Sequence, residues 1–295
     1  MSTVPASDVS DVQWIPSGIA SLDAILGGGF PTRRITEISG PFSVGKSTVA
    51  LTAIAQAQKL KFKTLWCDLE YSFERLYPVE VGVDLNKLLL MHERFAETAI
   101  DEIEAFADKN KNALIVVDAI GAMLPRAEAE KAAGEKVIGG QAGLVARFTR
   151  KIKPILDENN IALIVLNHEF TDIMSGRIMT SGGKKLEHAK DIWLKLRKAG
   201  KLIKSGENVL GEVITAEIRK NKVSNGMRKE CELHLMYGKG FSKESDLMQS
   251  ALDKGIFKKE GQMFLLDGVK VARGLNGLRE ALKDESLSAK VKSML

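Results

Sequence analysis

Residues 40–47 read Gly40-Pro-Phe-Ser-Val-Gly-Lys-Ser47 and fit the phosphate-binding pattern G-x-x-x-x-G-K-[ST]. Glycines in such a loop let the backbone curl, so that its N–H groups surround phosphate oxygens. Lys46 is expected to reach the β- and γ-phosphates of a nucleotide, and the Ser47 hydroxyl is expected to coordinate Mg²⁺. The phosphate-binding residues predicted from this stretch are Gly40, Pro41, Phe42, Ser43, Val44, Gly45, Lys46, Ser47 and Thr48.

The residues on either side of the loop support this prediction. An apolar run at 34–39 predicts a strand that leads into the loop. Residues 47–59 then show helical spacing, with apolar side chains at Val49, Ala50, Ala53, Ile54 and Ala57. The loop is therefore expected at a helix N-terminus, where the helix dipole favours bound anions.

Two acidic residues are candidates for the rest of a nucleotide site. Asp118 ends the apolar run at 113–118, and an aspartate after such a buried strand holds Mg²⁺ beside a phosphate loop. Ser47 and Asp118 are therefore the predicted metal ligands. Glu70 follows a predicted strand at 63–68, and a carboxylate beside the γ-phosphate can polarise the attacking water. The alternative for Glu70 is an ordinary solvated acid at a strand end.

Apolar runs alternate with helical patterns along most of the chain. Continuous apolar runs suit strands buried on both faces, and their alternation with helices predicts an α/β fold with a mainly parallel sheet. The predicted strands lie at 34–39, 63–68, 113–118, 161–167, 192–196 and 213–219, the last two towards the sheet edge, and the predicted helices lie within 14–29 and at 47–59 and 96–107.

The sequence divides into three predicted parts. Residues 1–13 are expected to be flexible, and 14–240 form the core. After residue 240 short helices surround a hairpin at FKKEGQMFLLDG, which predicts a separate small domain at 241–295. Within the core, 124–141 and 169–185 show no clean period, and long irregular segments in a compact domain are usually functional or disordered.

Composition narrows the class of protein. The chain of 295 residues is 44% hydrophobic and 27% charged, as in ordinary globular proteins. No apolar run approaches the roughly 18 residues that span a bilayer, and the polar N-terminus has no signal-peptide core. Two cysteines form neither a disulfide framework nor a zinc pattern. The expected location is therefore a reducing cytoplasm, of a bacterium or a phage-infected host.

Positive charge gathers in one part of the chain. Residues 161–240 hold 15 Lys and Arg against 9 Asp and Glu, whereas the remainder holds 28 against 29. Clustered Lys and Arg release counterions from a nucleic acid on binding, so this stretch is a candidate polyanion site. A solvated basic face is the alternative.

Seven phrases in order give the chain a family resemblance. They are SGIASLDAILGGGFPTRRITEISGPFSVGKST, WCDLEYSFERLYPVEVGVD, LIVVDAIGAM, VLNHEF, SGGKKLEHAKDIWLKLRK, EIRKNK and LDKGIFKKEGQMFLLDG. Over residues 15–282 the chain resembles bacterial RecA and related phage recombinases. The resemblance implies a P-loop NTPase core of the RecA-like type with a small α+β C-terminal domain.

The same resemblance implies an activity and its partners. The expected protein is an ATP-dependent recombinase that forms a helical filament on single-stranded DNA. With ATP and Mg²⁺ it would pair that strand with homologous duplex DNA and exchange strands, in recombination and repair. Single-strand-binding and loader proteins are further expected partners, and no membrane is expected.

Several residues match functional positions of the family. Glu70 matches the catalytic glutamate, while Glu74 and Tyr77 match residues that pack near the adenine. His168 stands where bacterial members carry a γ-phosphate-sensing glutamine, and histidine there is similar to phage recombinases. The residues with implied catalytic roles are Glu70, Lys46, His168, and the pair Lys220 and Lys222, which would reach across to a neighbour's ATP.

Two segments match the family's DNA-binding loops, 125–141 and 168–183. The second contains Phe170 as its only aromatic residue, so base stacking is not expected to dominate. Apolar side chains could wedge between bases and cations could contact phosphates. The candidate wedges are Ile173, Met174, Ile178 and Met179, and the candidate phosphate contacts are Arg177, Lys184 and Lys185. A surface loop or core packing is the alternative.

Two other functions would use the same catalytic residues. A ring-shaped helicase of this fold would also need Lys46, Asp118 and Glu70, and an ATP-binding paralogue could scaffold other recombinases. The matched lysine pair and the C-terminal domain favour the recombinase. The family's N-terminal docking arm is missing or reduced, which predicts altered filament assembly. The acidic tail of many bacterial members is also missing, which predicts less regulated access to DNA.

Overall fold

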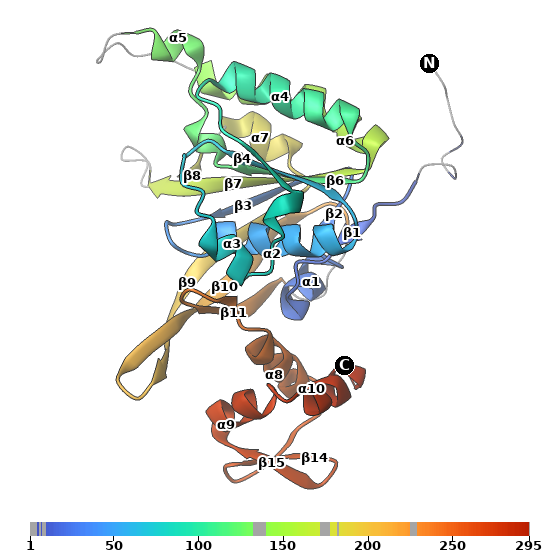
Figure 1. The fold of residues 1–295 in the computed structure, drawn as a ribbon, viewed down its shortest axis with the longest axis vertical. Helices are drawn as coiled ribbons and strands as arrows, with labels where there is room; N and C mark the ends of the chain where they lie inside the picture. Colours follow the sequence, from blue (N-terminus) through green and yellow to red (C-terminus); the bar gives the residue numbers. More distant parts are fainter. Residues whose placement is uncertain are drawn as a thin grey trace.

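The computed structural model describes residues 5, 7, 10–131, 140–171, 178–181, 183–224 and 229–294. Their centre is a ten-stranded sheet in the order β12-β11-β10-β9-β3-β7-β6-β4-β5, with β8 paired to β7 (Figure 1). The strands that run parallel are β3 (Ile35–Gly40), β4 (Lys63–Asp68), β5 (Leu88–Met91), β6 (Ala113–Asp118), β7 (Ile161–Thr171) and β9 (Ile192–Ser205). The antiparallel additions are β8 (Ile178–Thr180), β10 (Asn208–Asn221), β11 (Glu230–Met236) and β12 (Gly240–Phe241).

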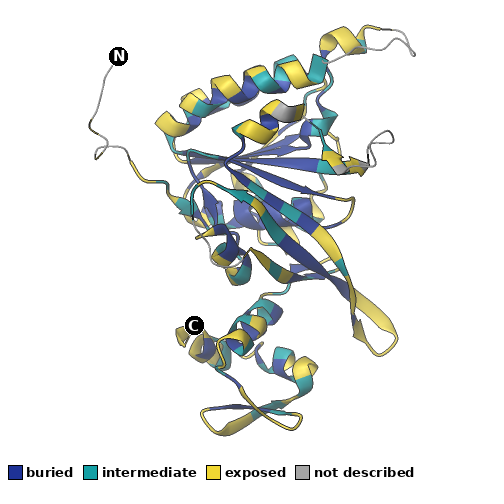
Figure 2. Cartoon of the chain, turned by 180° about the vertical axis from the view of Figure 1, so that it is seen from behind, coloured by how far each residue is buried: buried dark blue, intermediate teal, exposed yellow. Residues whose placement is uncertain are grey.

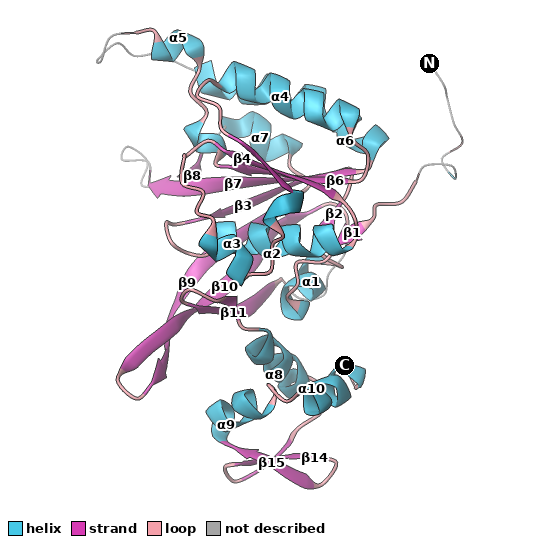
Figure 3. Ribbon diagram, in the orientation of Figure 1, coloured by secondary structure: helices cyan, strands magenta, loops and turns pink. Residues whose placement is uncertain are grey.

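Helices cover both faces of this sheet, which confirms the predicted α/β class (Figure 3). One face carries α1 (Ala20–Leu26) and α2 (Lys46–Lys59), and the other carries α4 (Ala96–Lys109), α6 (Gly140–Asn159) and α7 (Gly183–Ala189). Shorter elements are β1 (Trp14–Ile15), β2 (Phe30–Pro31), α3 (Leu76–Glu80), α5 (Arg126–Ala129) and the 3₁₀ turns Leu85–Lys87 and Ile120–Ala122.

The central strands are buried along most of their length (Figure 2). Their alternate side chains enter two separate cores, one on each face of the sheet. In β6, Leu114 and Val116 pack toward α2, while Ile115 and Val117 pack toward α4 and α6. All four are fully buried, and each stabilises the fold by about 1.5–3 kcal/mol. A strand covered on both faces must be apolar throughout, which is why the continuous runs predicted β3, β4, β6 and β7 well.

The strands predicted at 192–196 and 213–219 are too short. In the structure β9 and β10 continue as a paired ribbon that turns at residues 206 and 207, beyond the helix-covered region (Figure 1). Gly206 occupies a left-handed conformation (φ 61°), which suits a tight turn. The outer part of β9 is mostly exposed and contains Lys198, Lys201 and Lys204, so the apolar pattern ended before the strand did.

The two segments without a clean period contain regular structure. The first, 124–141, includes α5 and the start of α6, and its residues 132–139 lie outside the described part. The second, 169–185, includes the end of β7, β8 and the start of α7, and its residues 172–177 and 182 lie outside it. Of the predicted flexible N-terminus at 1–13, residues 1–4, 6, 8 and 9 also lie outside the described part.

Residues after β12 build a small α+β unit around its own apolar cluster. Its helices are α8 (Lys243–Asp253), α9 (Gly274–Ala281) and α10 (Glu285–Ser293), and its strands are β13 (Lys258–Glu260), β14 (Met263–Leu266) and β15 (Val269–Arg273). The predicted hairpin is β13–β14, and β15 adds a third strand that was not predicted. The exact domain boundary at residue 240 stays a prediction.

One carboxylate joins this unit to the core. Asp246 of α8 accepts hydrogen bonds from the backbone N–H groups of Ala20 and Ser21, at 2.7 and 3.1 Å. It thereby caps α1, whose own N-cap residue Ile19 provides no side-chain cap. None of the helices in the described residues is long and apolar enough to cross a membrane.

Candidate nucleotide site and basic groove

The predicted phosphate loop leaves the carboxyl end of β3 and enters α2. Parallel strands β3, β7, β6 and β4 end at this same edge, which is where α/β sheets bind ligands. Gly45, immediately before α2, has a left-handed conformation (φ 87°), and a Cβ there would lie 3.1 Å from the Phe241 ring. Glycine is therefore required here both by its backbone and by the close neighbour.

Lys46 lies folded back onto the loop. Its Nζ donates to the carbonyl oxygens of Pro41 and Gly40, at 2.8 and 3.0 Å, and lies 3.2 Å from Nδ1 of His168. Burial lowers the pKa of Lys46, while the nearby carboxylates of Asp118 and Glu70 act in the opposite direction. The ammonium thus stands at the centre of the predicted site, among groups of opposite charge.

The two predicted metal ligands are in contact. The Ser47 hydroxyl donates to Oδ2 of Asp118 at 3.0 Å, which joins the start of α2 to the end of β6. Burial raises the pKa of Asp118 to about 6, although the Ser47 hydrogen bond acts against this shift. A hydroxyl and a carboxylate side by side fit Mg²⁺, which takes oxygen ligands and is usually held by one or two carboxylates plus substrate phosphates.

Glu70 and His168 meet across the sheet edge. Nε2 of His168 lies 2.8 Å from Oε1 of Glu70. Because a lysine ammonium can only donate, Nδ1 of His168 accepts from Lys46, and the ring proton is assigned to Nε2, which donates to Glu70. The structure therefore places the predicted catalytic glutamate, the predicted sensor and the phosphate-loop lysine in one hydrogen-bonded chain.

The segment between β4 and α3 is shaped by Asp68. Its buried carboxylate accepts from the backbone N–H groups of Ser72 and Phe73, at 3.1 and 2.9 Å. These bonds fix the turn that carries Glu70. Sequence reasoning did not assign Asp68 a role, although its position two residues before Glu70 is a usable signal.

The two predicted adenine-side residues have different surroundings. Tyr77 on α3 shares a hydrogen bond of 2.8 Å with the Thr48 hydroxyl, so it is tied to the predicted phosphate-binding helix. Burial raises the pKa of Tyr77. Glu74 is exposed in the turn before α3. Their roles toward a base stay predictions.

Lys220 and Lys222 lie away from their own phosphate loop. They stand at the end of β10, where Asn221 pairs with Ile192 and Ile192 pairs with Thr36 near the start of β3. The phosphate loop leaves the other end of β3, about 13 Å further along the strand. The Nζ of Lys220 donates to the backbone oxygen of Glu187 on α7 at 2.7 Å. Within one chain, this pair therefore does not join the site.

The described part of the second predicted DNA loop is the β7–β8 hairpin. Phe170 on β7 pairs with Met179 on β8, and their side chains are 49% and 46% exposed. Asn167, next to His168, holds this hairpin by accepting from Ser181 N–H and donating to its carbonyl oxygen. Arg177, Ile173 and Met174, and the side chains of Ile178 and Lys184, lie outside the described part.

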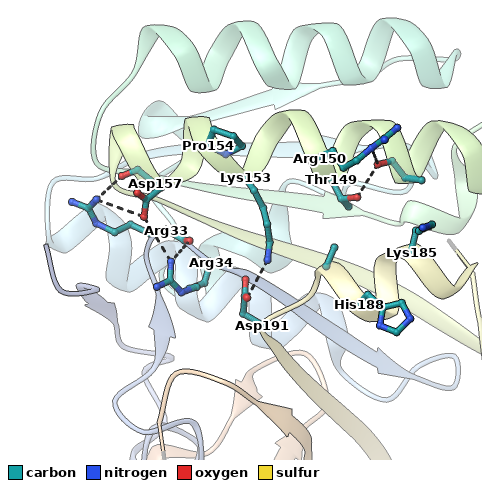
Figure 4. Close-up of a pocket in the computed structure, with 12 residues that line it drawn as sticks. Arg33, Arg34, Thr149, Arg150, Lys153, Pro154, Asp157, Lys185, His188 and Asp191 are labelled. Atoms are coloured by element: carbon teal, nitrogen blue, oxygen red, sulfur yellow. Dashed lines mark hydrogen bonds and ion pairs between the residues drawn. The ribbon is translucent and has the colours of Figure 1, made fainter. Parts of the chain in front are cut away.

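A groove of about 720 Å³ opens between α6, α7 and the start of β3 (Figure 4). Its lining includes five cationic residues and two carboxylates, which are Arg33, Arg34, Arg150, Lys153, Lys185, Asp157 and Asp191. Arg33 and Arg34 lie 3.8 and 3.7 Å from Asp157. Lys153 lies 3.1 Å from Asp191. Cations therefore outnumber carboxylates in this groove.

The end of the groove toward α7 is the more electropositive. Arg150 and Lys185 line it and make no ion pair with a carboxylate of the described residues (Figure 4). Burial lowers the pKa of Lys220, and the charges of Lys222 and Lys153 lower it further, so the lysine pair belongs to the same positive region. Of these residues, only Lys185, Lys220 and Lys222 were predicted from the sequence. Arg150 and Lys153 could have been found as cations three positions apart on one helix.

Comparison with known proteins decides the family. The model of the RecA N-terminal domain matches residues 2–242 of this chain. The chain belongs to the RecA family. It is 35% identical to Protein RecA of Ruminococcus albus over 278 residues, which are 93% of this chain and 69% of that protein.

Other RecA proteins give a similar level of identity. With Protein RecA of Thermus aquaticus the identity is 35% over 289 residues, 95% of this chain and 85% of that one. With Protein RecA of Heliobacterium modesticaldum it is 32%, over 96% and 83%. The RecA resemblance drawn from the seven sequence phrases is confirmed by these matches.

Proposed function

We propose that this protein is an ATP-dependent DNA recombinase that assembles on single-stranded DNA, hydrolyses ATP and promotes homologous pairing and strand exchange. Membership of the RecA family supports recombination and repair as its general activity. The observation that carries the chemical part is the cluster of Lys46, Ser47, Asp118 and Glu70 at one edge of the sheet.

In this proposal the residues of the cluster divide the work of ATP hydrolysis. The phosphate loop and the α2 N-terminus hold the phosphates, and Lys46 neutralises charge on the β- and γ-groups. Ser47 and Asp118 would hold Mg²⁺, which neutralises charge on the phosphate oxygens. Glu70 orients and polarises the attacking water, and His168 holds the Glu70 carboxylate through Nε2–H.

The basic groove and the β7–β8 hairpin are the proposed DNA contacts. Arg150 and Lys185 supply cations without carboxylate partners among the described residues, which suits phosphates of the backbone. The exposed pair Phe170 and Met179 supplies an apolar surface on the β7–β8 hairpin. The Asn167 side chain holds this hairpin, and the next residue in β7 is His168 of the ATP site. The proposed DNA contacts and the ATP site therefore share one strand, β7.

Subunits of the proposed filament would share each ATP site. Lys220 and Lys222 lie at the opposite end of β3 from their own Lys46, so we assign their cations to a neighbour's nucleotide rather than to their own. A cation brought in by a docked neighbour stabilises the transferring phosphoryl group only in the correct assembly. This arrangement couples the ATP state to filament geometry and, through α7, to the DNA groove.

The deciding experiment measures ATP turnover with and without single-stranded DNA, followed by strand exchange between a circular single strand and a homologous linear duplex. A recombinase should show turnover stimulated by single-stranded DNA and should form joint molecules only with homologous duplex. Unwinding of a forked duplex without joint molecules would favour the helicase. DNA binding without ATP turnover would favour the non-catalytic paralogue.

A further inference from the structure

The imidazole of His168 is held from three directions. Its two nitrogens contact Lys46 and Glu70, at 3.2 and 2.8 Å. Its face lies against the phenyl ring of Phe42, with ring centroids 4.4 Å apart and 24° between the planes. Phe42 stands in the middle of the phosphate loop, so the loop touches His168 with both its lysine and its aromatic residue.

The position of the Phe42 side chain is not explained by packing into the core. Its side chain is 71% exposed, and it belongs to neither of the apolar clusters that cover the sheet. The Lys46 ammonium lies 5.9 Å from its ring centroid, near the outer limit of a cation–π contact. Of the two ring contacts that Phe42 makes with described residues, the stack on His168 is therefore the shorter.

We propose that Phe42 is a positioning residue for ATP hydrolysis and that it acts through His168. This inference rests on the proposed ATPase function. Stacking fixes the plane of the imidazole, so that Nε2–H points at Glu70 and the Glu70 carboxylate faces the attacking water. A hydrogen bond at each nitrogen fixes two points of the ring, and the stack restricts rotation about the line through them.

The stack becomes more important when nucleotide binds. Lys46 is the group expected to reach the phosphates, and that movement takes the ammonium away from Nδ1 of His168. The remaining constraints on the imidazole are then the Glu70 hydrogen bond and the Phe42 ring. Phe42 is therefore expected to affect the rate of the chemical step rather than the affinity for ATP.

The first test separates kcat from KM. Phe42→Leu keeps an apolar side chain of similar size but removes the aromatic face, and Phe42→Tyr keeps the face. Aromatic stacks have energies that correspond to a change of about threefold to tenfold. Phe42→Leu should lower kcat by this factor with KM for ATP within about twofold, and Phe42→Tyr should restore kcat. An unchanged kcat, or a loss that Phe42→Tyr does not restore, would overturn the proposal.

The second test asks whether Phe42 acts through His168. His168→Gln is the matched background, because a side-chain amide can still accept from Lys46 and donate to Glu70 but has no aromatic ring. In this background Phe42→Leu should change kcat by less than about twofold. The same loss in both backgrounds would show that Phe42 acts independently of the imidazole and would overturn the inference.

A third measurement does not depend on turnover. The protein has four histidines, so their ring C–H signals can be assigned by NMR with His168→Gln. Phe42→Leu should move the His168 signals downfield by removing the ring current, and Phe42→Tyr should not. Unmoved signals would overturn the stack. A wild-type protein without ATP turnover would instead contradict the proposed function, whatever the NMR result.

Discussion

His168 Nε2 lies 2.8 Å from Glu70 Oε1, and this contact joins the end of β7 to the turn after β4. The two strands are separated in the sheet by β6, so neither residue reaches the other through strand pairing. Through this contact, His168 orients the proposed water-activating carboxylate of Glu70, and His168 lies on β7, the strand that continues into the predicted DNA loop. Hydrolysis and DNA binding would thus depend on the same strand end.

Glu70→Gln is expected to lower ATP turnover by about two to four orders of magnitude, the usual effect of losing a general base. Affinity for ATP should stay close to that of the wild type, because Lys46 and the phosphate loop are unchanged. Lys46→Ala is the matched comparison and should weaken nucleotide binding itself. Steady-state turnover and equilibrium binding of a fluorescent ATP analogue measure the two effects. Turnover of Glu70→Gln equal to wild type would remove Glu70 from the mechanism.

Asp23 makes stability depend on pH. It accepts a hydrogen bond from Ser17 N–H at 2.7 Å, and burial raises its pKa to about 6 from the ordinary value of 3.8. The folded state therefore holds this proton more tightly than the unfolded chain does. The stabilisation from this group is complete below about pH 4 and is lost as pH rises through about 6.

Asp23→Asn is expected to raise the free energy of unfolding at pH 7.5, by at most about 3 kcal/mol. An asparagine can still accept from Ser17 but has no charge to desolvate, and the gain should vanish below about pH 4. Urea unfolding at several pH values measures it. The exposed Asp101 on α4 provides the control, since Asp101→Asn should change stability by less than about 0.5 kcal/mol. Equal stability of Asp23→Asn and wild type at pH 7.5 would contradict the assignment.

Sequence patterns predicted most accurately those elements that a single local stretch determines. The phosphate loop and its helix are a single stretch, and each strand buried on both faces is a single apolar run, so β3, β4, β6 and β7 were found. Strands β5 and β11 were missed, as was α6. Strand β5 has only four residues, and two of these are exposed because it is the sheet edge. A strand this short has too few apolar residues for its pattern to be distinguished from that of a loop.

Contacts between distant segments were beyond sequence reasoning. The role of Glu70 was predicted from its position after a strand and from the family resemblance, and that of His168 from the resemblance alone. Their hydrogen bond depends on a sheet order that places β6 between their strands. The basic groove was missed for the same reason, because its cations come from three separate segments. Arg33, Arg150 and Lys185 become neighbours only when α6 and α7 pack on the same face.

Salt dependence should reveal which groove residues contact DNA. Replacing Arg150 and Lys185 with Ala should reduce the magnitude of the negative slope of log K against log salt concentration. The expected change is about 0.7 for each lost contact to a single strand. Affinity at a fixed salt concentration should fall with it. Lys109→Ala, at the end of α4 and outside the groove lining, is the control and should leave the slope unchanged. Fluorescence anisotropy with a labelled oligonucleotide measures K, and an unchanged slope and affinity in the double variant would exclude this groove.

The shared ATP site makes a prediction about mixtures. Lys46→Ala has a defective phosphate loop with intact Lys220 and Lys222, and Lys220→Ala/Lys222→Ala has the reverse. Each variant alone is expected to be inactive on single-stranded DNA. Mixed filaments contain some interfaces that pair an intact loop with intact lysines, so part of the ATP turnover should return.

Complementation is expected because Lys220 and Lys222 stand at the opposite end of β3 from the phosphate loop of their own chain. If the lysines instead contact only DNA, the double variant should lose DNA affinity, and mixing should restore no more turnover than extra DNA does. Measuring turnover at saturating DNA separates these outcomes. Full activity of the double lysine variant alone would mean that one chain completes the site. Filaments of the mixture, seen by electron microscopy but without recovered turnover, would also rule out the shared site.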